Sequence, residues 1–366
     1  MALTENPHYV KAIERNVSTK ICSPDNRKRR RPGMGSLRSL ICSLLVLSMT
    51  TPCTSFAADH IQVTKELLLE SGLPAQPHAI ARTFEGGYII AGKLGVEAWA
   101  TRIAANGTVQ WRHIVPTGSS APGFPTQQYA GVAMLKDDSS ILCGYKKIDS
   151  GAGQDLVGII THIDKSGRVI SEREVYPNGD KSYSITYLRG CVTSVNGAQI
   201  SGDTMRFDKS GQSSRFDYFI AIGEDGKIVS EKLLDPTPFP KTSTEDVLRA
   251  SELHFEHAAA IGVIAKAEKI ETKKAFYLPD HSVALFGYHY IGGNAFTAST
   301  TWVSADIASS QTFVFEPINA SIWVTDVVAT GNPWEFATVR PVLPVQHLIG
   351  PDEKRMGAAL AFVRFK

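Results

Sequence analysis

Recognisable catalytic motifs are absent from this 366-residue sequence. It holds no G-x-S-x-G nucleophile elbow, no phosphate-binding glycine loop and no HExxH pair of metal-binding histidines. The repeated tetrapeptides Asp164–Gly167 and Asp208–Gly211 lack the ligand spacing of a calcium loop and are typical of hairpin turns. The sequence therefore assigns no catalytic residue, no metal ligand and no cofactor site, and it leaves the binding residues unknown.

A long hydrophobic run is also missing. The main apolar run, Leu40–Leu47, is too short to span a bilayer comfortably. It follows the basic run Arg27–Arg31 and precedes the small-residue pattern Ser55–Ala57. Together these features predict a secretory signal peptide cleaved after Ala57, and so a periplasmic or secreted protein. A buried core helix or a membrane anchor is the competing interpretation of the apolar run.

Residues 1–57 are therefore expected to be an upstream extension and signal peptide, and residues 58–366 a single domain. Translation starts at Met1 or at Met34, a choice that the sequence leaves open. No membrane span is expected once the leader is removed.

A strong net charge is lacking as well. The whole chain carries 38 Lys and Arg against 36 Asp and Glu, a formal charge of +2. Nine of the basic and three of the acidic residues precede residue 58, so the rest holds 29 basic and 33 acidic residues, near −4. The basic character belongs to the leader, which removes the case for a nucleic-acid partner. A protein partner is expected instead, with the chain as a monomer or in a complex with that partner.

Cysteine is scarce, with five in the chain and only Cys143 and Cys191 after residue 57. In an exported protein, two cysteines are candidates for a disulfide. The alternative is a pair of small buried side chains, and the choice depends on geometry that the sequence does not show.

One pattern is plentiful, and it is strongest in Gly86–Trp111, which reads GGYIIAGKLGVEAWATRIAANGTVQW. Tyr88–Ala91 is a short aromatic and β-branched run, and Trp99–Ile103 alternates large apolar and polar residues. Ala105–Gly107 suits a tight turn, after which Val109–Trp111 begins a return strand. The stretch therefore predicts three antiparallel strands.

Weaker copies of this order of strand, glycine, strand, turn and strand follow along the chain. Equivalent positions are separated by 52, 58, 85 and 51 residues and fall at Gly92, Gly144, Gly202, Gly287 and Thr338. A repeat near 50 residues with about four strands in each unit is typical of a β-propeller. We therefore predict an all-β propeller of five four-stranded blades, or six if the long interval contains another.

The first copy resembles the blade repeat of bacterial secreted β-propeller proteins. The resemblance rests on GGYIIAG, on the strand AWATRI and on NGTVQW, and the later copies keep the glycines and hairpins but fit less closely. It covers the mature chain in outline and implies a propeller fold and export. It implies no activity, because this fold carries binding proteins, lyases, hydrolases and scaffolds alike.

Two segments complete the predicted plan. His60–Glu70 is expected to pair with the last repeat as its missing outer strand and so close the ring, although Glu66–Glu70 also fits a short helix. The long interval is expected to hold a partly helical insertion at about 236–275, with a helix over 244–258 and Ala259–Ala267 either its continuation or a strand.

Isolated polar residues complete the list of candidates. His254 and His257 are spaced to share one side of a helix, but no third ligand lies near them, and a solvated or half-buried role is the simpler interpretation. Arg82, Arg189 and Asp326 fall on stretches expected to be innermost strands around the central channel. Channel-lining and turn residues of this kind are common, so they are not assigned as a site.

Two functions remain from different classes. The first is an exported, non-enzymatic binding protein that uses loops on one propeller face, one version being an immunity-type inhibitor of a toxic enzyme in the periplasm. The alternative is an exported enzyme that acts on glycans or other extracellular polymers. The absence of a convergent acid and base set favours the first.

Overall fold

The computed structural model describes residues 60–70, 74–116, 127–149, 154–208, 210–235, 255–292, 295–315, 324–342 and 357–366. The predicted leader over 1–57 and the first part of the predicted helix, 244–254, lie outside these residues. Strands make up most of the described residues and α2 is a single helix among them, so the all-β prediction is confirmed.

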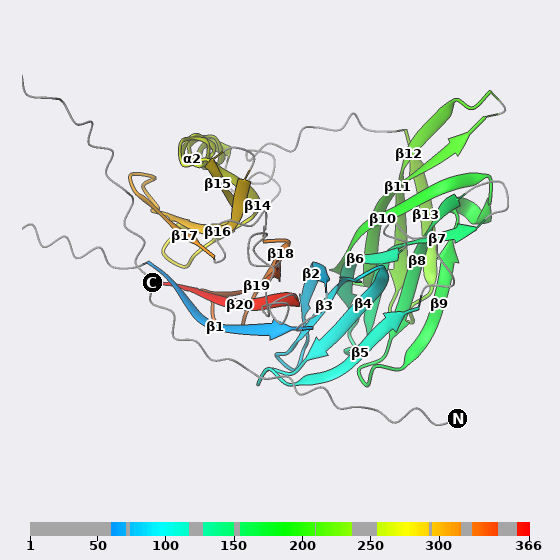
Figure 1. Cartoon of the computed structure of the whole chain (residues 1–366), viewed down its shortest axis with the longest axis horizontal. Coiled ribbons are helices and arrows are strands. Elements are labelled where there is room, and N and C mark those ends of the chain that lie inside the picture. Colours follow the sequence, from blue (N-terminus) through cyan, green and yellow to red (C-terminus); the bar gives the residue numbers. More distant parts are fainter. Residues whose placement is uncertain are drawn as a thin grey trace, which may run out of the picture.

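The strands follow one another in antiparallel groups of four along the chain (Figure 1). The first group is β2 (Ala75–Arg82), β3 (Tyr88–Leu94), β4 (Glu97–Ile103) and β5 (Val109–Val115). The second is β6 (Gln127–Met134), β7 (Ser140–Asp149), β8 (Gln154–Ile163) and β9 (Val169–Val175). The predicted strands of Gly86–Trp111 are therefore present.

A 3₁₀ turn, η1 (Pro177–Gly179), leads to the third group, which contains β10 (Tyr183–Ser194), β11 (Gly197–Phe207), β12 (Ser213–Gly223) and β13 (Ile228–Leu234). A parallel bridge between Ile185 and Leu156 joins the second and third groups. The fourth group is β14 (Ile270–Tyr277), β15 (Val283–Gly292), β16 (Ala295–Val303) and β17 (Ser310–Val314).

The last group combines both ends of the described chain, in the order β1 (Ile61–Leu69), β20 (Gly357–Phe365), β19 (Glu335–Val342) and β18 (Asp326–Ala329). Ile61 pairs with Phe365 and Leu69 with Ala358, so the N-terminal segment is the outer strand of this sheet. The predicted pairing of this segment with the last repeat is confirmed, and the helical alternative for Glu66–Glu70 is wrong.

The packing of successive groups is propeller-like. One apolar core cluster joins β2–β5 to β6–β9 through side chains such as Trp111 and Tyr129, and another joins the second group to the third through Cys143 and Leu188. Within the described residues, however, no sheet closes on itself and no strand of the third group pairs with the fourth.

The repeated glycines that mark the units have a steric cause. Gly92 on β3 lies opposite Pro77, where the register of β2 shifts by one residue. A β-carbon at Gly92 would lie 2.1 Å from the carbonyl oxygen of Gln76, and one at Gly144 would lie 1.9 Å from that of Gln128. Similar register shifts occur opposite Gly144, Gly202 and Gly287. The bulged residues, which have no cross-strand partner in β2, β6, β10 and β14, are His78, Ala130, Arg189 and Lys273. Such a bulge changes the direction in which its side chain points.

The helix of the predicted insertion is α2 (Phe255–Ala267), so Ala259–Ala267 continues a helix rather than forming a strand. Ile261 is buried with Val283, Leu285 and Val303, which places α2 over one face of the fourth group. Strand β14 begins at Ile270, inside the range expected for the insertion.

Cys143 and Cys191 are both buried and unpaired, so the disulfide that the sequence left open is not formed. They lie in the same core cluster, and the Cys191 thiol donates a hydrogen bond to the carbonyl oxygen of Ile141 at 3.4 Å. Burial raises the pKa of the Cys143 thiol well above its ordinary value, as expected for an unreactive cysteine.

Candidate functional site

Arg82, Arg189 and Asp326 lie on β2, β10 and β18, which belong to three different groups. Each makes its own set of contacts, and the structure does not bring the three together into one site. Their surroundings therefore have to be considered one at a time.

Asp326 holds three strands together. One carboxylate oxygen accepts a hydrogen bond from the backbone N–H of Ile80 on β2 at 2.9 Å. The other forms an ion pair with Lys274 Nζ on β14 at 2.5 Å, and the same ammonium donates to the carbonyl of Val327 at 3.0 Å. A carboxylate satisfied from two neighbouring strands is placed to stabilise their packing.

Arg82 is exposed at the end of β2. Its guanidinium lies beside Gly331, where a β-carbon would be 2.9 Å from Nη2. It also lies near Tyr88, whose pKa is raised by burial and lowered in part by the Arg82 charge. Gly331 leaves room for this side chain, and nothing around it forms a catalytic arrangement.

Arg189 belongs to a group of four charged side chains on the third sheet. Its Nε donates to one carboxylate oxygen of Asp203. Arg215 Nε lies 3.4 Å from the other oxygen, and Arg215 Nη2 lies 3.7 Å from Asp217. Asp203 and Asp217 are direct cross-strand partners on β11 and β12. Facing carboxylates repel one another, and the two guanidinium groups offset that repulsion.

The four side chains differ in exposure. The Asp203 side chain is 1% exposed and that of Arg215 is 20% exposed, whereas that of Arg189 is 55% exposed. A buried carboxylate therefore fixes a guanidinium group that solvent reaches. We call Arg189, Asp203, Arg215 and Asp217 the arginine–aspartate cluster.

Two tyrosines border the cluster. The Arg189 guanidinium carbon lies 5.5 Å from the centre of the Tyr187 ring, within the range of a cation–π contact. Tyr145 of β7 meets Tyr187 edge to face, with ring centres 4.9 Å apart. Burial raises the pKa of Tyr145, the neighbouring Tyr187 raises it further, and the Arg189 charge lowers it. Arginine and tyrosine side by side at a surface are the residue types that dominate protein interfaces.

The sequence had identified only Arg189 in this cluster. The facing of Asp203 and Asp217 could have been predicted by counting outward from the turn at Ser210–Gly211, since positions equally distant from a hairpin turn face one another. No local signal indicated Tyr145, because it comes from the preceding group of strands.

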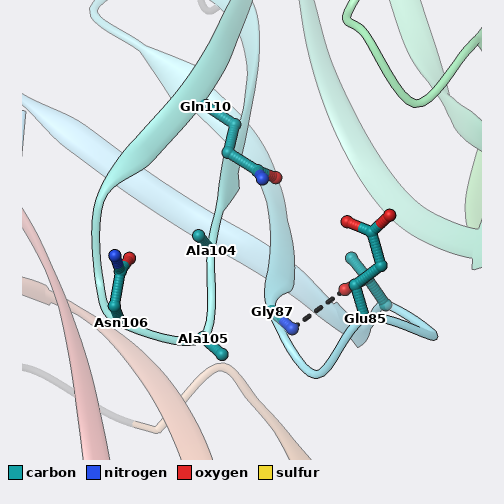
Figure 2. A pocket seen from close by; sticks show the side chains of 7 residues that line it. Glu85, Gly87, Ala104, Ala105, Asn106 and Gln110 are labelled. Carbon is teal, nitrogen blue, oxygen red and sulfur yellow. Dashed lines mark hydrogen bonds between the residues drawn. The ribbon is translucent and has the colours of Figure 1, made fainter.

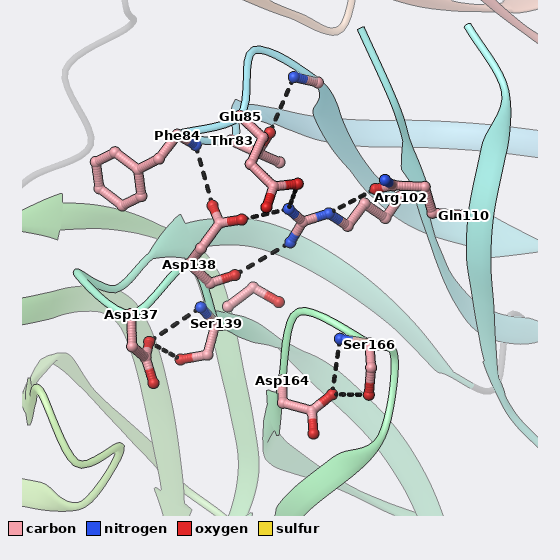
Figure 3. Close-up of polar contacts among 12 residues, drawn as sticks. Thr83, Phe84, Glu85, Arg102, Gln110, Asp137, Asp138, Ser139, Asp164 and Ser166 are labelled. Atoms are coloured by element: carbon pink, nitrogen blue, oxygen red, sulfur yellow. Dashed lines mark hydrogen bonds and ion pairs between the residues drawn. The ribbon is translucent and has the colours of Figure 1, made fainter. Parts of the chain in front are cut away.

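A second polar network surrounds Arg102 at the turns of the first two sheets (Figure 3). Arg102 is 1% exposed. Its Nε donates to Gln110 at 2.8 Å, Nη1 donates to the carbonyl of Asp138 at 3.1 Å, and Nη2 pairs with the carboxylates of Asp138 and, at 3.3 Å, Glu85. With all three nitrogens engaged, Arg102 is suited to join β4 to the β6–β7 turn rather than to bind a ligand.

A shallow depression adjoins this network (Figure 2). Glu85 and Gln110, which contact Arg102, are also part of its lining. The other lining residues come from the β2–β3 and β4–β5 turns and are Thr83, Gly87, Ala104, Ala105 and Asn106. Glu85 is the one ionisable side chain in this lining, so the depression offers no acid and base pair.

The residue types of a hydrolase triad occur together in Ser139, His162 and Asp137, but the contacts among them differ from those of a triad. Ser139 Oγ lies 2.9 Å from His162 Nε2, and it also donates to Asp137 at 2.5 Å. In a catalytic triad the carboxylate orients the histidine, whereas here it holds the serine. The pKa of His162 is lowered mainly by burial, and the opposite face of its ring lies against Gly226. This arrangement packs the second group of strands against the third.

Among the described residues, no group of three or more His, Cys, Asp or Glu side chains is placed to hold a metal ion. His257 lies in α2, and its predicted companion His254 is outside the described residues. None of the helices in the described part of the chain has the length and apolar character needed to cross a membrane.

No protein-family profile and no curated protein matches this chain. Among solved structures, it is similar to a Dyadobacter fermentans protein of unknown function, with 11% identity, a TM-score of 0.44 and coverage of 84% of this chain and 100% of that one. A Hadza microbial sialidase gives 12% identity, a TM-score of 0.33 and coverage of 72% and 52%. A Bombyx mori beta-fructofuranosidase gives 7% identity, a TM-score of 0.34 and coverage of 80% of this chain and 61% of that one. TM-scores below 0.5 at such identities support no conclusion about activity.

Proposed function

We propose that this chain is an exported, non-enzymatic binding protein, and that it contacts another protein through the part of the third sheet that carries the arginine–aspartate cluster. An immunity-type inhibitor that caps a toxic enzyme in the periplasm is one form of this function. The observation that carries the proposal is a solvent-exposed arginine held rigid by a buried carboxylate beside two tyrosines.

The predicted architecture is part of the proposal, with five four-stranded blades closed by β1. Contacts between neighbouring groups support it because they repeat. Leu67 of β1 packs on the turn glycine Gly107, and Trp111 of β5 packs on Gly167 of the next sheet. Arg173 of β9 then donates to the carbonyl of Gly226 in the turn after that at 2.9 Å. A constant relation between each outer strand and the next turn is expected of blades around one axis.

The predicted leader over 1–57 supports export. The binding role is supported by the two polar networks, whose charged groups are paired with one another rather than arranged for catalysis. The alternative, an enzyme acting on glycans, gains no specific support, because Arg82, Arg189 and Asp326 belong to separate contact sets.

A co-purification experiment tests this function. The mature chain from residue 58, immobilised through a C-terminal tag, is incubated with periplasmic extract of its host, and retained proteins are identified by mass spectrometry. A defined protein retained at a fixed stoichiometry is the expected result. Retention of no protein would contradict the proposal, and hydrolysis of a polysaccharide by the mature chain would favour the alternative.

A further inference from the structure

The Arg189 side chain presents an unused pair of hydrogen-bond donors. Only its Nε has a hydrogen-bond partner among the described residues, which leaves Nη1 and Nη2 without one in that part of the chain. The side chain as a whole is 55% exposed, so solvent reaches it. Two parallel N–H groups on one guanidinium match the two oxygens of a carboxylate.

The fixed position of Arg189 lowers the cost of using those donors. An arginine free in solvent loses rotamer freedom when a ligand orders it, and that loss weakens binding. Here the bulge in β10, the carboxylate of Asp203 and the ring of Tyr187 already hold the side chain. Much of the ordering is therefore done before any partner arrives.

Charge balance also permits an incoming anion. Arg189 and Arg215 carry two positive charges, and Asp203 and Asp217 carry two negative charges. The carboxylate of Asp203 contacts Nε of Arg189 and also pairs with Arg215. The positive charge of Arg215 therefore offsets the repulsion between Asp203 and an anion at the terminal nitrogens of Arg189. Tyr187 and Tyr145 add apolar ring surface for the carbon chain that bears the anion.

We infer that Arg189 binds a carboxylate group from an acidic segment of a partner protein, with Tyr187 and Tyr145 as the adjoining apolar surface. This inference rests on the proposed binding function, and it specifies the partner chemistry of that surface.

The test measures binding of poly-L-glutamate to the mature chain by isothermal titration calorimetry at low salt. Arg189→Gln removes the two donors, while Arg189→Lys keeps the positive charge but removes their planar geometry. Arg168→Gln is the matched control, because Arg168 is an exposed arginine that pairs with Asp164 in the β8–β9 turn. We expect a roughly 10- to 100-fold loss of affinity for Arg189→Gln, as for hydrogen bonds to charged groups, and an unchanged affinity for Arg168→Gln.

Two further measurements separate structural damage from lost binding. Urea unfolding reports the stability of Arg189→Gln, which is expected to fold because Arg215 still pairs with Asp203. In the wild-type chain, poly-L-glutamate is expected to protect Arg189 from phenylglyoxal, with the modified arginine identified by mass spectrometry. Lysine at 189 is expected to recover only part of the affinity. Equal affinity for wild type and Arg189→Gln, or equal loss in Arg168→Gln, would overturn the inference.

Polygalacturonate distinguishes the source of the carboxylate. Binding of this acidic glycan with no binding of poly-L-glutamate would overturn the assignment to a protein segment. If wild type and Arg189→Gln retain the same partner protein from extract equally well, this inference fails while the proposed function stands. If neither retains any protein, the proposed function itself fails.

Discussion

The buried pair of Arg102 and Asp138 gives the sharpest test of how the first two sheets are held together. Arg102→Met keeps the length of the side chain and removes the charge. Asp138→Asn keeps the shape, still accepts the hydrogen bond from the N–H of Phe84, and suits the left-handed backbone at this position, where φ is 64°. The double variant removes both charges at once.

The expected magnitudes follow from burial. Arg102 is 1% exposed and Asp138 8%, so Arg102→Met leaves a carboxylate in a poorly solvated site and is expected to cost about 3–5 kcal/mol. Asp138→Asn is expected to cost about 1.5–3 kcal/mol, because Glu85 and the carbonyl of Asp138 continue to hold the guanidinium. In the double variant no charge is left unpaired at Asp138, so its cost is expected to fall about 2 kcal/mol short of the sum.

Urea unfolding followed by tryptophan fluorescence gives the free energy of unfolding for each variant, and Arg168→Met at an exposed pair is the control, with no measurable change expected. Costs of the two single substitutions that add within about 0.5 kcal/mol would refute the coupling between the two charges. A control variant as unstable as Arg102→Met would show that burial of the pair does not set the cost.

Three other outcomes are expected. Gly144→Ala places a β-carbon 1.9 Å from the carbonyl oxygen of Gln128 and is expected to lower the free energy of unfolding by about 3 kcal/mol in urea. Gly190→Ala is the control, because a β-carbon there meets no atom within 4 Å. A small effect of Gly144→Ala would contradict the steric argument. Burial lowers the pKa of His78 from 6.5 to about 4, so this side chain is neutral in the folded state above that pH. Below pH 6.5 the unfolded chain therefore binds more protons than the folded chain. The free energy of unfolding is expected to fall by up to about 3 kcal/mol between pH 6.5 and about 4. His78→Gln should flatten that part of the profile, and an unchanged slope would rule His78 out as its source. Cys143 and Cys191 of the mature chain are expected to react with Ellman's reagent only after unfolding, and two unreactive cysteines in denaturant would reveal a disulfide.

The strand pattern of this chain could be predicted because local chemistry fixes it. Tight turns such as Ala105–Gly107 set the hairpin registers, and the spacing of Gly92 and Gly144 follows from a bulge that recurs in each unit. The pairing of His60–Glu70 with the last repeat was also predictable, since a three-stranded final unit needs a fourth strand.

The contacts of the candidate site were beyond the sequence for the opposite reason. The ion pair between Asp326 and Lys274 joins two different sheets, and the meeting of Tyr145 with Tyr187 joins two successive groups of strands. Such contacts depend on how sheets are placed side by side, and no periodicity along one strand encodes that placement. Arg189 was identified as a polar residue on an inner strand, but its direction depends on the bulge at Leu188–Gly190.

The union of β1 with β20 also governs the order in which the molecule can be completed. Leu67 pairs with Leu360, a residue near the other end of the described chain, so this contact forms only after β20 has been synthesised. Until then Ile61–Leu69 is an unsatisfied strand that other chains could pair with, and Lys65 and Glu66 near its middle supply the charges that discourage such aggregation. Loss of β1 would therefore expose the edge of β20, whereas loss of β20 would expose the edge of β19 and leave β1 without its partner, so the two strands depend on each other.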